Sequence, residues 1–420
     1  MNNSTIIEGY KYAKEILHKQ NVDVDFALDK LDKIPLSMQC WQGDDVRGFD
    51  SIENLSGGIT STGNYIGIPR NIDELRSDIK KAVSLIPGKL KLNLHASYVD
   101  KSDQSKDRDS YSIQDFQTWI DFVKKLNMGM DFNPTFFSHP KMDGNFSLSS
   151  KNEKIRSFWI EHGKRCREIG LEFAKQTGEP CIVNFWMPDG YKDICVDTVF
   201  RRELMLDSLD RIFATDIDST LVPCSVESKL FGIGIEGHTV VNHEFAYGYC
   251  LKNNLLYCLD AGHFHPTELI STKISSLLFF MDRVSLHVSR NVHWDSDHIV
   301  ILNDELQAIM DEIVWHDWLD RVHIATDFFD ASVNRIAAWV IGIRNCRKAL
   351  LSSLLAPYQQ MREYELNEDF TSRIALQEAR KMLPLGAVWN YYCYKNDMPL
   401  DHDIMPEINL YEKETLLKRQ

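Results

Sequence analysis

The sequence predicts an α/β fold, a (β/α)8 TIM barrel with additional N- and C-terminal helices. Eight short apolar segments typical of strands alternate with mostly helical segments between Leu36 and Asp327. Such alternation requires parallel strands joined by right-handed crossovers, and eight units of this kind close a barrel. Nearly every strand candidate also carries a polar residue at or just past its C-terminal end. A doubly wound sheet would gather such residues at one switch point instead, so the barrel is favoured.

The N-terminal part predicts helices, one strand and a long loop. Apolar residues recur at helical spacing over Asn3–Asp32. The first strand candidate, Leu36–Trp41, leads into a Gly/Ser/Asn segment, Gly48–Pro69. A loop of that length in a compact enzyme is usually a lid or part of a site. Asn71 or Asp73 is predicted to cap the helix that follows.

Strands and helices then alternate regularly. The further predicted strands are Leu90–Leu94, Gly129–Asn133, Cys181–Phe185, Cys224–Phe231, Leu255–Asp260, Val284–Val288 and Val322–Ala325. The predicted helices between them are Ile113–Leu126, Ile155–Thr177, Arg201–Ile212, Thr267–Phe280 and Leu306–Val314.

The chain changes character after Asp330. Three helical patterns, Arg335–Leu354, Arg373–Leu383 and Ala387–Asn396, follow one another with no strand between them. We expect the first to close the barrel and the others to form an appended helical region. The predicted division is an N-terminal helical extension at 1–33, the barrel with the site at 34–345, and a C-terminal helical region at 346–420.

Charge and cysteine usage exclude some classes of function. The formal net charge of −14 makes nucleic acid and anionic membrane surfaces poor partners. The nine cysteines are scattered without a C-x-x-C pair, which favours a reducing, cytoplasmic setting. Cys258 lies inside an apolar run and is interpreted as a small core residue rather than a reactive thiol. The N-terminus lacks the apolar run of a signal peptide, and no later run is long enough to span a bilayer.

The stretch Leu255–Pro266 carries the clearest chemical signal. Its apolar run ends at Asp260, at the carboxyl edge of the predicted sheet, and Gly262 allows the chain to fold back so that His263 can face that carboxylate. Oxygen and nitrogen ligands gathered in this way suit a divalent cation. A capped turn with a surface histidine would explain this stretch alone, but the same pattern recurs at other strand ends.

Seven candidate ligands lie at or near the ends of the later strands: Glu227, Asp260, His263, His287, Asp295, Asp297 and Asp327. Five carboxylates at a barrel mouth would repel one another unless cations neutralise them, and one ion cannot use so many ligands. We therefore predict two ions, one held by Glu227, Asp260, His287 and Asp327 and the other by His263, Asp295 and Asp297, with Asp260 placed to bridge them. Such oxygen-rich sites suit Mn²⁺, Mg²⁺ or Co²⁺ better than a closed structural zinc site.

Aromatic residues at strand ends are candidates for a substrate wall. Trp41, Trp186, Phe132 and Phe136 are either ordinary core or the apolar surface against which the C–H face of a sugar packs.

A competing pattern is Gly232-x-Gly234-x-x-Gly237, which matches a dinucleotide-binding fingerprint and would suggest a nicotinamide-dependent oxidoreductase. The preceding strand carries Glu227 and Lys229, and no amphipathic helix opens at the third glycine. We therefore disfavour this interpretation.

The chain resembles the L-rhamnose isomerase family over nearly its whole length. The segments that carry the resemblance are Ser37–Val46, Gly57–Tyr65, Leu92–His95, Asp131–Pro134, Val226–Gly234, Cys258–Glu268, Trp294–His298 and Asp327–Ala331. The resemblance implies a barrel with extra helices, a homotetramer, Mn²⁺ dependence and reversible conversion of L-rhamnose to L-rhamnulose. It also implies the two ligand sets given above, and each of these ligands is present.

The predicted reaction moves one hydrogen from C2 to C1 of an open-chain sugar and one proton between oxygens. We expect a direct hydride shift assisted by two metals, with an enediol route using a carboxylate such as Asp327 as the alternative. Lys229 is expected to hydrogen-bond the oxygen at C1, and His95 to orient a hydroxyl or assist ring opening. A metal-dependent barrel hydrolase or phosphodiester nuclease would use similar ligands, but it needs a basic groove, and the charge of −14 argues against one.

Overall fold

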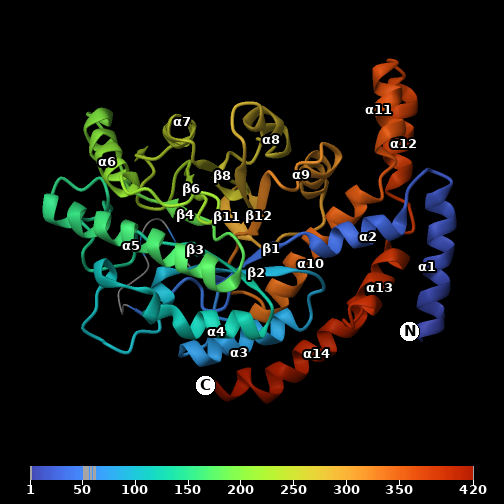
Figure 1. Ribbon diagram of the computed structural model, residues 1–420, viewed down its shortest axis with the longest axis horizontal. Helices are drawn as coiled ribbons and strands as arrows, with labels where there is room; N and C mark the ends of the chain where they lie inside the picture. The colour runs from blue at the N-terminus through green and yellow to red at the C-terminus, as the bar shows by residue number, and fades with distance from the viewer. Residues whose placement is uncertain (1, 51–55, 57–58, 60–62, 420) are drawn as a thin grey trace.

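A closed eight-stranded parallel barrel forms the centre of the protein, as predicted (Figure 1). The computed structural model describes residues 2–50, 56, 59 and 63–419, and among these it leaves out the side chains of residues 291 and 294–297. The predicted loop Gly48–Pro69 therefore falls partly outside the described residues. The barrel strands are β1 (Leu36–Gln39), β2 (Leu90–His95), β3 (Gly129–Asn133), β4 (Val183–Trp186), β6 (Cys224–Glu227), β8 (Leu256–Asp260), β9 (Val284–Val288) and β12 (Val322–Thr326).

Helices surround the barrel and extend from it at both chain ends. They are α1 (Asn3–His18), α2 (Val24–Lys33), α3 (Ile72–Val83), α4 (Gln117–Lys125), α5 (Glu153–Thr177), α6 (Thr198–Phe213), α7 (His243–Asn253), α8 (Ser271–Leu278), α9 (Asp304–Trp315), α10 (Arg335–Leu354), α11 (Tyr358–Leu366), α12 (Phe370–Arg380), α13 (Leu385–Lys395) and α14 (Asp401–Glu414). Of the two predicted caps for α3, Asn71 is the one that accepts a hydrogen bond from the backbone N–H of Glu74.

Two small antiparallel sheets lie in the loops that follow the barrel strands. β5 (Gly190–Tyr191) pairs with β7 (His238–Thr239), and β10 (Arg290–Val292) pairs with β11 (Trp294–His298), both antiparallel. The predicted strand Cys224–Phe231 was too long, because β6 ends at Glu227 and the backbone N–H of Lys229 already bonds the carbonyl of Val241. The predicted helix Thr267–Phe280 was also too long, since α8 covers only Ser271–Leu278.

The N-terminal helix α1 packs against α13 of the C-terminal region. The rings of Tyr10 in α1 and Tyr391 in α13 stack with centroids 3.7 Å apart, and Figure 1 shows the two helices side by side. In the same view α11 and α12 project away from the barrel. The division of the chain at residues 33 and 345 stays a prediction, and residue 345 lies inside α10. Among the described residues, no helix combines the length and the apolar composition that crossing a membrane requires.

The interior of the barrel is polar at its N-terminal end. The ammonium group of Lys91 forms a buried ion pair with Asp131 and also donates to the carbonyl of Pro180 at 2.8 Å. The carboxylate of Asp131 further accepts from the hydroxyl of Ser37 at 2.6 Å and from the backbone N–H of Ile182 at 2.8 Å. Because both partners make further hydrogen bonds, this pair leaves no uncompensated charge at the N-terminal end.

We predict that Lys91→Met destabilises the protein by about 3–5 kcal/mol, because it leaves the carboxylate of Asp131 charged and buried without its cation. The free energy of unfolding from a denaturant titration measures the loss. Lys175→Met is the control: Lys175 pairs with Glu172 where both side chains are well exposed, so its removal should change stability by no more than about 0.5 kcal/mol. Equal stability of the Lys91 variant and the wild type would contradict the proposed role of the pair.

Candidate metal centre

Four of the predicted ligands converge at the C-terminal mouth of the barrel. They come from four strands that neighbour one another in the order β12, β9, β8 and β6. Glu227 is the last residue of β6, Asp260 is the last of β8, His287 lies near the end of β9, and Asp327 directly follows β12. Each residue offers one ligand atom, and all four atoms lie within 4.8 Å of one another. This is the spacing that ligands around a single cation require.

The strand register explains the convergence. Asp260 on β8 stands opposite His287 on β9, and the same histidine stands opposite Ala325 on β12, two residues before Asp327. Because residues two apart on a strand share a face, the ligands on adjacent strands point into the same space. The imidazole Nδ1 of His287 lies 3.0 Å from Asp327 Oδ2, 3.4 Å from Glu227 Oε2 and 3.5 Å from Asp260 Oδ2.

In Asp260 and Asp327, one carboxylate oxygen accepts a hydrogen bond from a donor at the edge of the cluster, and the other oxygen points toward His287. Asp260 Oδ1 accepts from the backbone N–H of Gly262 at 2.6 Å, which is the turn predicted after this strand. Asp327 Oδ1 accepts from the indole Nε1 of Trp41 at 3.0 Å. Asp260 Oδ2 is buried and has no hydrogen-bond partner among the described residues. A buried carboxylate oxygen without a donor is costly unless a cation neutralises it, so the site fits a metal ion.

Burial and mutual repulsion shift the pKa values of these groups. Burial raises the pKa of Asp260 to about 6. Burial alone would lower the pKa of His287, but the surrounding acidic groups outweigh it and hold this pKa well above its ordinary value. Burial acts upward on Asp327 as well, yet its hydrogen bond with His287 and other nearby imidazoles bring its pKa below the usual range. The cluster therefore favours positive charge at its centre.

The predicted second set is described only in part. The Nδ1 atom of His263 lies 2.9 Å from Glu227 Oε1 and 2.9 Å from the carbonyl oxygen of Ser228, so this imidazole borders the first cluster. Asp295 and Asp297 belong to β11, but their side chains lie outside the described part of the structure.

The predicted substrate-contacting residues line the same mouth. Lys229 Nζ lies 3.2 Å from His263 Nε2 and 5.1 Å from the ring centroid of Trp186. Trp186 in turn stacks on His263, with centroids 5.9 Å apart.

On the other side of the mouth, the ring of His95 meets that of Trp41 edge-on at 4.4 Å, and its Nδ1 lies 2.9 Å from the hydroxyl of Thr135. Burial lowers the pKa of His95 to about 3, so this imidazole is neutral.

Of the two interpretations that the sequence left open for Phe132 and Phe136, the structure supports ordinary core. Phe132 packs against Phe116 and Phe173, and Phe136 packs against residues of α5, so both belong to the core behind the strands. Phe137 takes the expected place, with its ring 5.2 Å from Trp186 and 5.8 Å from His95. Thr135 adopts a positive φ of 63°, which breaks the alternation that a continuous strand would have.

Sequence reasoning missed the buried residues that hold Glu227. Asn184 on β4 donates through Nδ2 to Glu227 Oε2 at 2.5 Å, and its own Oδ1 accepts from the hydroxyl of Ser225 at 2.6 Å. Only the register of β4 against β6, which places Asn184 opposite Ser225, brings these residues together. Cys258, assigned to the core, is indeed buried, and burial raises the pKa of its thiol to about 12.

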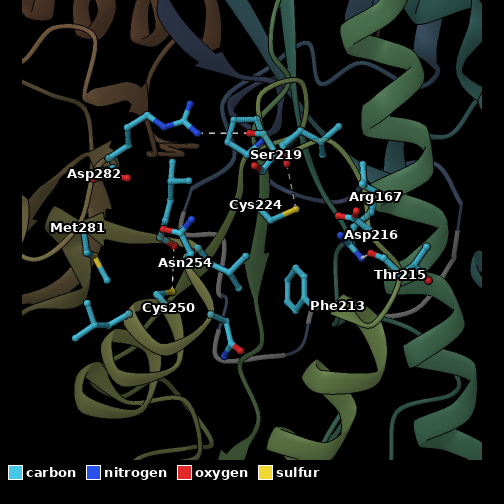
Figure 2. A pocket seen from close by; sticks show the side chains of 18 of the residues that line it. Arg167, Phe213, Thr215, Asp216, Ser219, Cys224, Cys250, Asn254, Met281 and Asp282 are labelled. Atoms are coloured by element: carbon cyan, nitrogen blue, oxygen red, sulfur yellow. Dashed lines mark hydrogen bonds between the residues drawn. The ribbon is translucent and has the colours of Figure 1, made fainter.

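Two other features of the chain lie apart from the centre. A cavity of about 310 Å³ opens at the opposite, N-terminal ends of β6 and β8, and none of the predicted site residues is among the described residues that line it (Figure 2). The glycine pattern Gly232–Gly237 connects β6 to β7, and the next described helix, α7, begins only at His243. This described segment therefore does not form the strand–turn–helix unit that a dinucleotide site needs.

Comparison with known proteins bears on the family. The L-rhamnose isomerase (RhaA) family model matches residues 4–419. An L-rhamnose isomerase of Salmonella typhimurium is 50% identical over 413 residues, 98% of each chain. Another from Mannheimia succiniciproducens is 51% identical over 417 residues, 99% of this chain and 100% of its own.

Solved structures show weaker likeness. Mannonate dehydratase from Streptococcus suis gives a TM-score of 0.45 at 10% identity, over 77% of this chain and 94% of its own. A D-tagatose 3-epimerase-like protein gives 0.43 at 12% identity, over 66% and 90%. Likeness at this level carries no argument about function. The near full-length identity to named relatives and the match of the family model confirm the resemblance seen in the sequence: the chain belongs to the L-rhamnose isomerase family.

Proposed function

We propose that the protein catalyses the reversible conversion of L-rhamnose to L-rhamnulose. The observation that carries the proposal is the convergence of Glu227, Asp260, His287 and Asp327, whose ligand atoms lie within 4.8 Å of one another at the barrel mouth. The names of the relatives supply the substrate. The hydrolase or nuclease considered from the sequence gains no support from this family.

Mn²⁺ is the proposed cofactor, two ions per subunit, with Co²⁺ or Mg²⁺ as substitutes. Three carboxylates and one imidazole form the first ligand set, and His263 with Asp295 and Asp297 would form the second. Oxygen-rich sets of this kind suit Mn²⁺. When bound, such ions polarise sugar oxygens and orient adjacent hydroxyls.

The side chains around the ligands are proposed to bind and orient the open-chain sugar. Lys229 would donate a hydrogen bond to the oxygen at C1. His95 is neutral, so one of its ring nitrogens can accept a hydrogen bond from a sugar hydroxyl and orient that hydroxyl. Trp41 and Trp186 would pack on the C–H face of the sugar and keep water away from the reacting carbons.

We propose a direct hydride shift from C2 to C1 rather than an enediol. The alternative requires a carboxylate such as Asp327 to take the proton from C2. Asp327 is itself one of the proposed ligands, and its Oδ1 accepts a hydrogen bond from the indole N–H of Trp41 at 3.0 Å. A carboxylate held on both sides in this way stays charged and fixed rather than acting as a mobile base, which supports the hydride route.

Assembly and location complete the proposal. We propose a homotetramer. The helices α11 and α12 project from the barrel, and three of their apolar side chains are at least half exposed in the single chain: Leu366, Phe370 and Ile374. Apolar surface of this kind favours contact with another subunit. We propose a cytoplasmic location, because all nine cysteines carry free thiols, as expected in a reducing compartment.

The first test is an assay of purified protein for conversion of L-rhamnose to L-rhamnulose, before and after chelation. We expect activity that chelation abolishes and Mn²⁺ restores. Glu227→Gln should lower kcat/KM by more than about 100-fold, because it removes a charged ligand, whereas Glu268→Gln, at a partly exposed residue paired with Lys273, should not. Absence of any aldose–ketose interconversion in the Mn²⁺-loaded protein would refute the proposal.

The hydrogen bond from Asn184 to Glu227 predicts a measurable effect on metal binding. Asn184→Ala should weaken Mn²⁺ binding by about 10- to 100-fold, since a ligand that loses its outer partner is less well oriented. Titration calorimetry of the metal-free protein measures this directly. Asn93→Ala is the control, because Asn93 is equally buried in the barrel but its Oδ1 accepts from Asn133 instead. Equal weakening by both variants would assign the effect to general disturbance of the barrel.

Solvent exchange separates the two routes. In deuterated water we expect L-rhamnulose without deuterium at C1, because a hydride that moves directly between carbons never meets solvent. L-Rhamnose deuterated at C2 should conversely deliver its label to C1 in ordinary water. Mass spectrometry of the product reads both, and solvent deuterium at C1 would require the enediol route.

A further inference from the structure

A buried thiol lies directly against the proposed ligands. Cys258 precedes Asp260 by two residues on β8, and side chains two apart on a strand point to the same side. Since Asp260 faces the cluster, Cys258 faces the barrel interior one layer below it. The strand register agrees, because Cys258 on β8 stands opposite Glu227 on β6.

The thiol closes a second group of potential ligands. One ligand atom each from Glu227, Cys258 and His287 lie within 4.8 Å of one another. All three side chains are buried, with exposed fractions of 2%, 0% and 2%. Glu227 and His287 belong to both groups, so the two groups overlap and cannot each hold an ion independently.

The two groups differ in the cation they suit. The group with Asp260 and Asp327 offers three carboxylates and one imidazole, a hard set that favours Mn²⁺ or Mg²⁺. The group with Cys258 offers one sulfur, one nitrogen and one oxygen. That mixture, completed by a water molecule, matches the three protein ligands and open position of many zinc sites.

We propose that Glu227, Cys258 and His287 form an alternative site for Zn²⁺, and that an ion bound there excludes Mn²⁺ from the neighbouring oxygen-rich set. On binding, the sulfur–zinc bond replaces the S–H bond and the thiol proton passes to the buffer, with no change of oxidation state. The proposal shares two ligands with the proposed Mn²⁺ site, but it does not depend on any isomerase activity.

X-ray absorption spectroscopy at the zinc edge tests the proposal on the full-length protein. After removal of metals and addition of one equivalent of Zn²⁺, we expect a sulfur scatterer at about 2.3 Å together with nitrogen or oxygen at about 2.0–2.2 Å. In Cys258→Ser the sulfur shell should vanish. In Cys346→Ser it should remain, because Cys346 is equally buried but lies on α10, away from the ligands.

Competition supplies the second measurement. Zn²⁺ should displace Mn²⁺ from the wild type, as followed by the electron paramagnetic resonance signal of free Mn²⁺. Cys258→Ser should raise the Zn²⁺ concentration for half-displacement by at least about 10-fold, since loss of even an outer partner weakens metal binding by that much. Its affinity for Mn²⁺ should stay within about twofold of the wild type, which also shows that the variant is folded.

The outcomes are distinct. Only nitrogen and oxygen around zinc in the wild type would overturn the proposal even if no variant folded, and so would a sulfur shell that survives in Cys258→Ser. A sulfur shell in a protein without isomerase activity would leave this inference standing and remove the proposed function instead.

Discussion

The negative charge of buried, closely spaced carboxylates is the constraint on which the rest of the site depends. Glu227, Asp260 and Asp327 stand close together at the ends of parallel strands, because the barrel brings its strand ends to one mouth. In a medium of low dielectric constant, carboxylates this close strongly oppose one another's ionisation unless a cation is present. The same negative charge raises the pKa of His287, because a protonated imidazole partly neutralises the carboxylates. A divalent ion would neutralise them further.

The surroundings of the carboxylates answer this constraint with directed hydrogen bonds. Trp41 and the backbone of Gly262 each bind the outer oxygen of one carboxylate and leave the inner oxygen for the centre. Asn184 binds Glu227, and Ser225 fixes the amide of Asn184. These donors come from neighbouring strands or the next turn. Because the barrel holds the donors in place, they keep the ligand side chains in a fixed orientation. Preorganisation of this kind lets a metal bind without reordering its own ligands.

The charged side chains are paired at one end of the barrel interior and unbalanced at the other. At the N-terminal end, Lys91 and Asp131 compensate each other's charge and make further hydrogen bonds, so this pair stabilises the fold. At the C-terminal end, acidic groups outnumber cationic ones and an oxygen of Asp260 has no donor among the described residues. Between the two lies the thiol of Cys258, which adds a soft ligand beside a hard set. Both ends belong to the same fold. The N-terminal end stabilises the protein because its charges are paired, and the C-terminal end can bind ions because its negative charges are in excess.

The sequence by itself determined the barrel and most of its site, because strand periodicity, the glycine turn after Asp260 and polar strand ends are all local signals. It left open whether Phe132 and Phe136 belong to the core or to a substrate wall, because an aromatic residue near a strand end fits either, and only their packing against Phe173 and Trp159 decides for the core. Helix α14 was not predicted, and it contains Pro406, a residue that lacks the backbone N–H of a regular helix. Tertiary structure alone decided that Asn184 holds Glu227 and that Cys258 joins the ligands. Both contacts follow from the register between neighbouring strands, and register depends on hydrogen bonds between segments far apart in the chain.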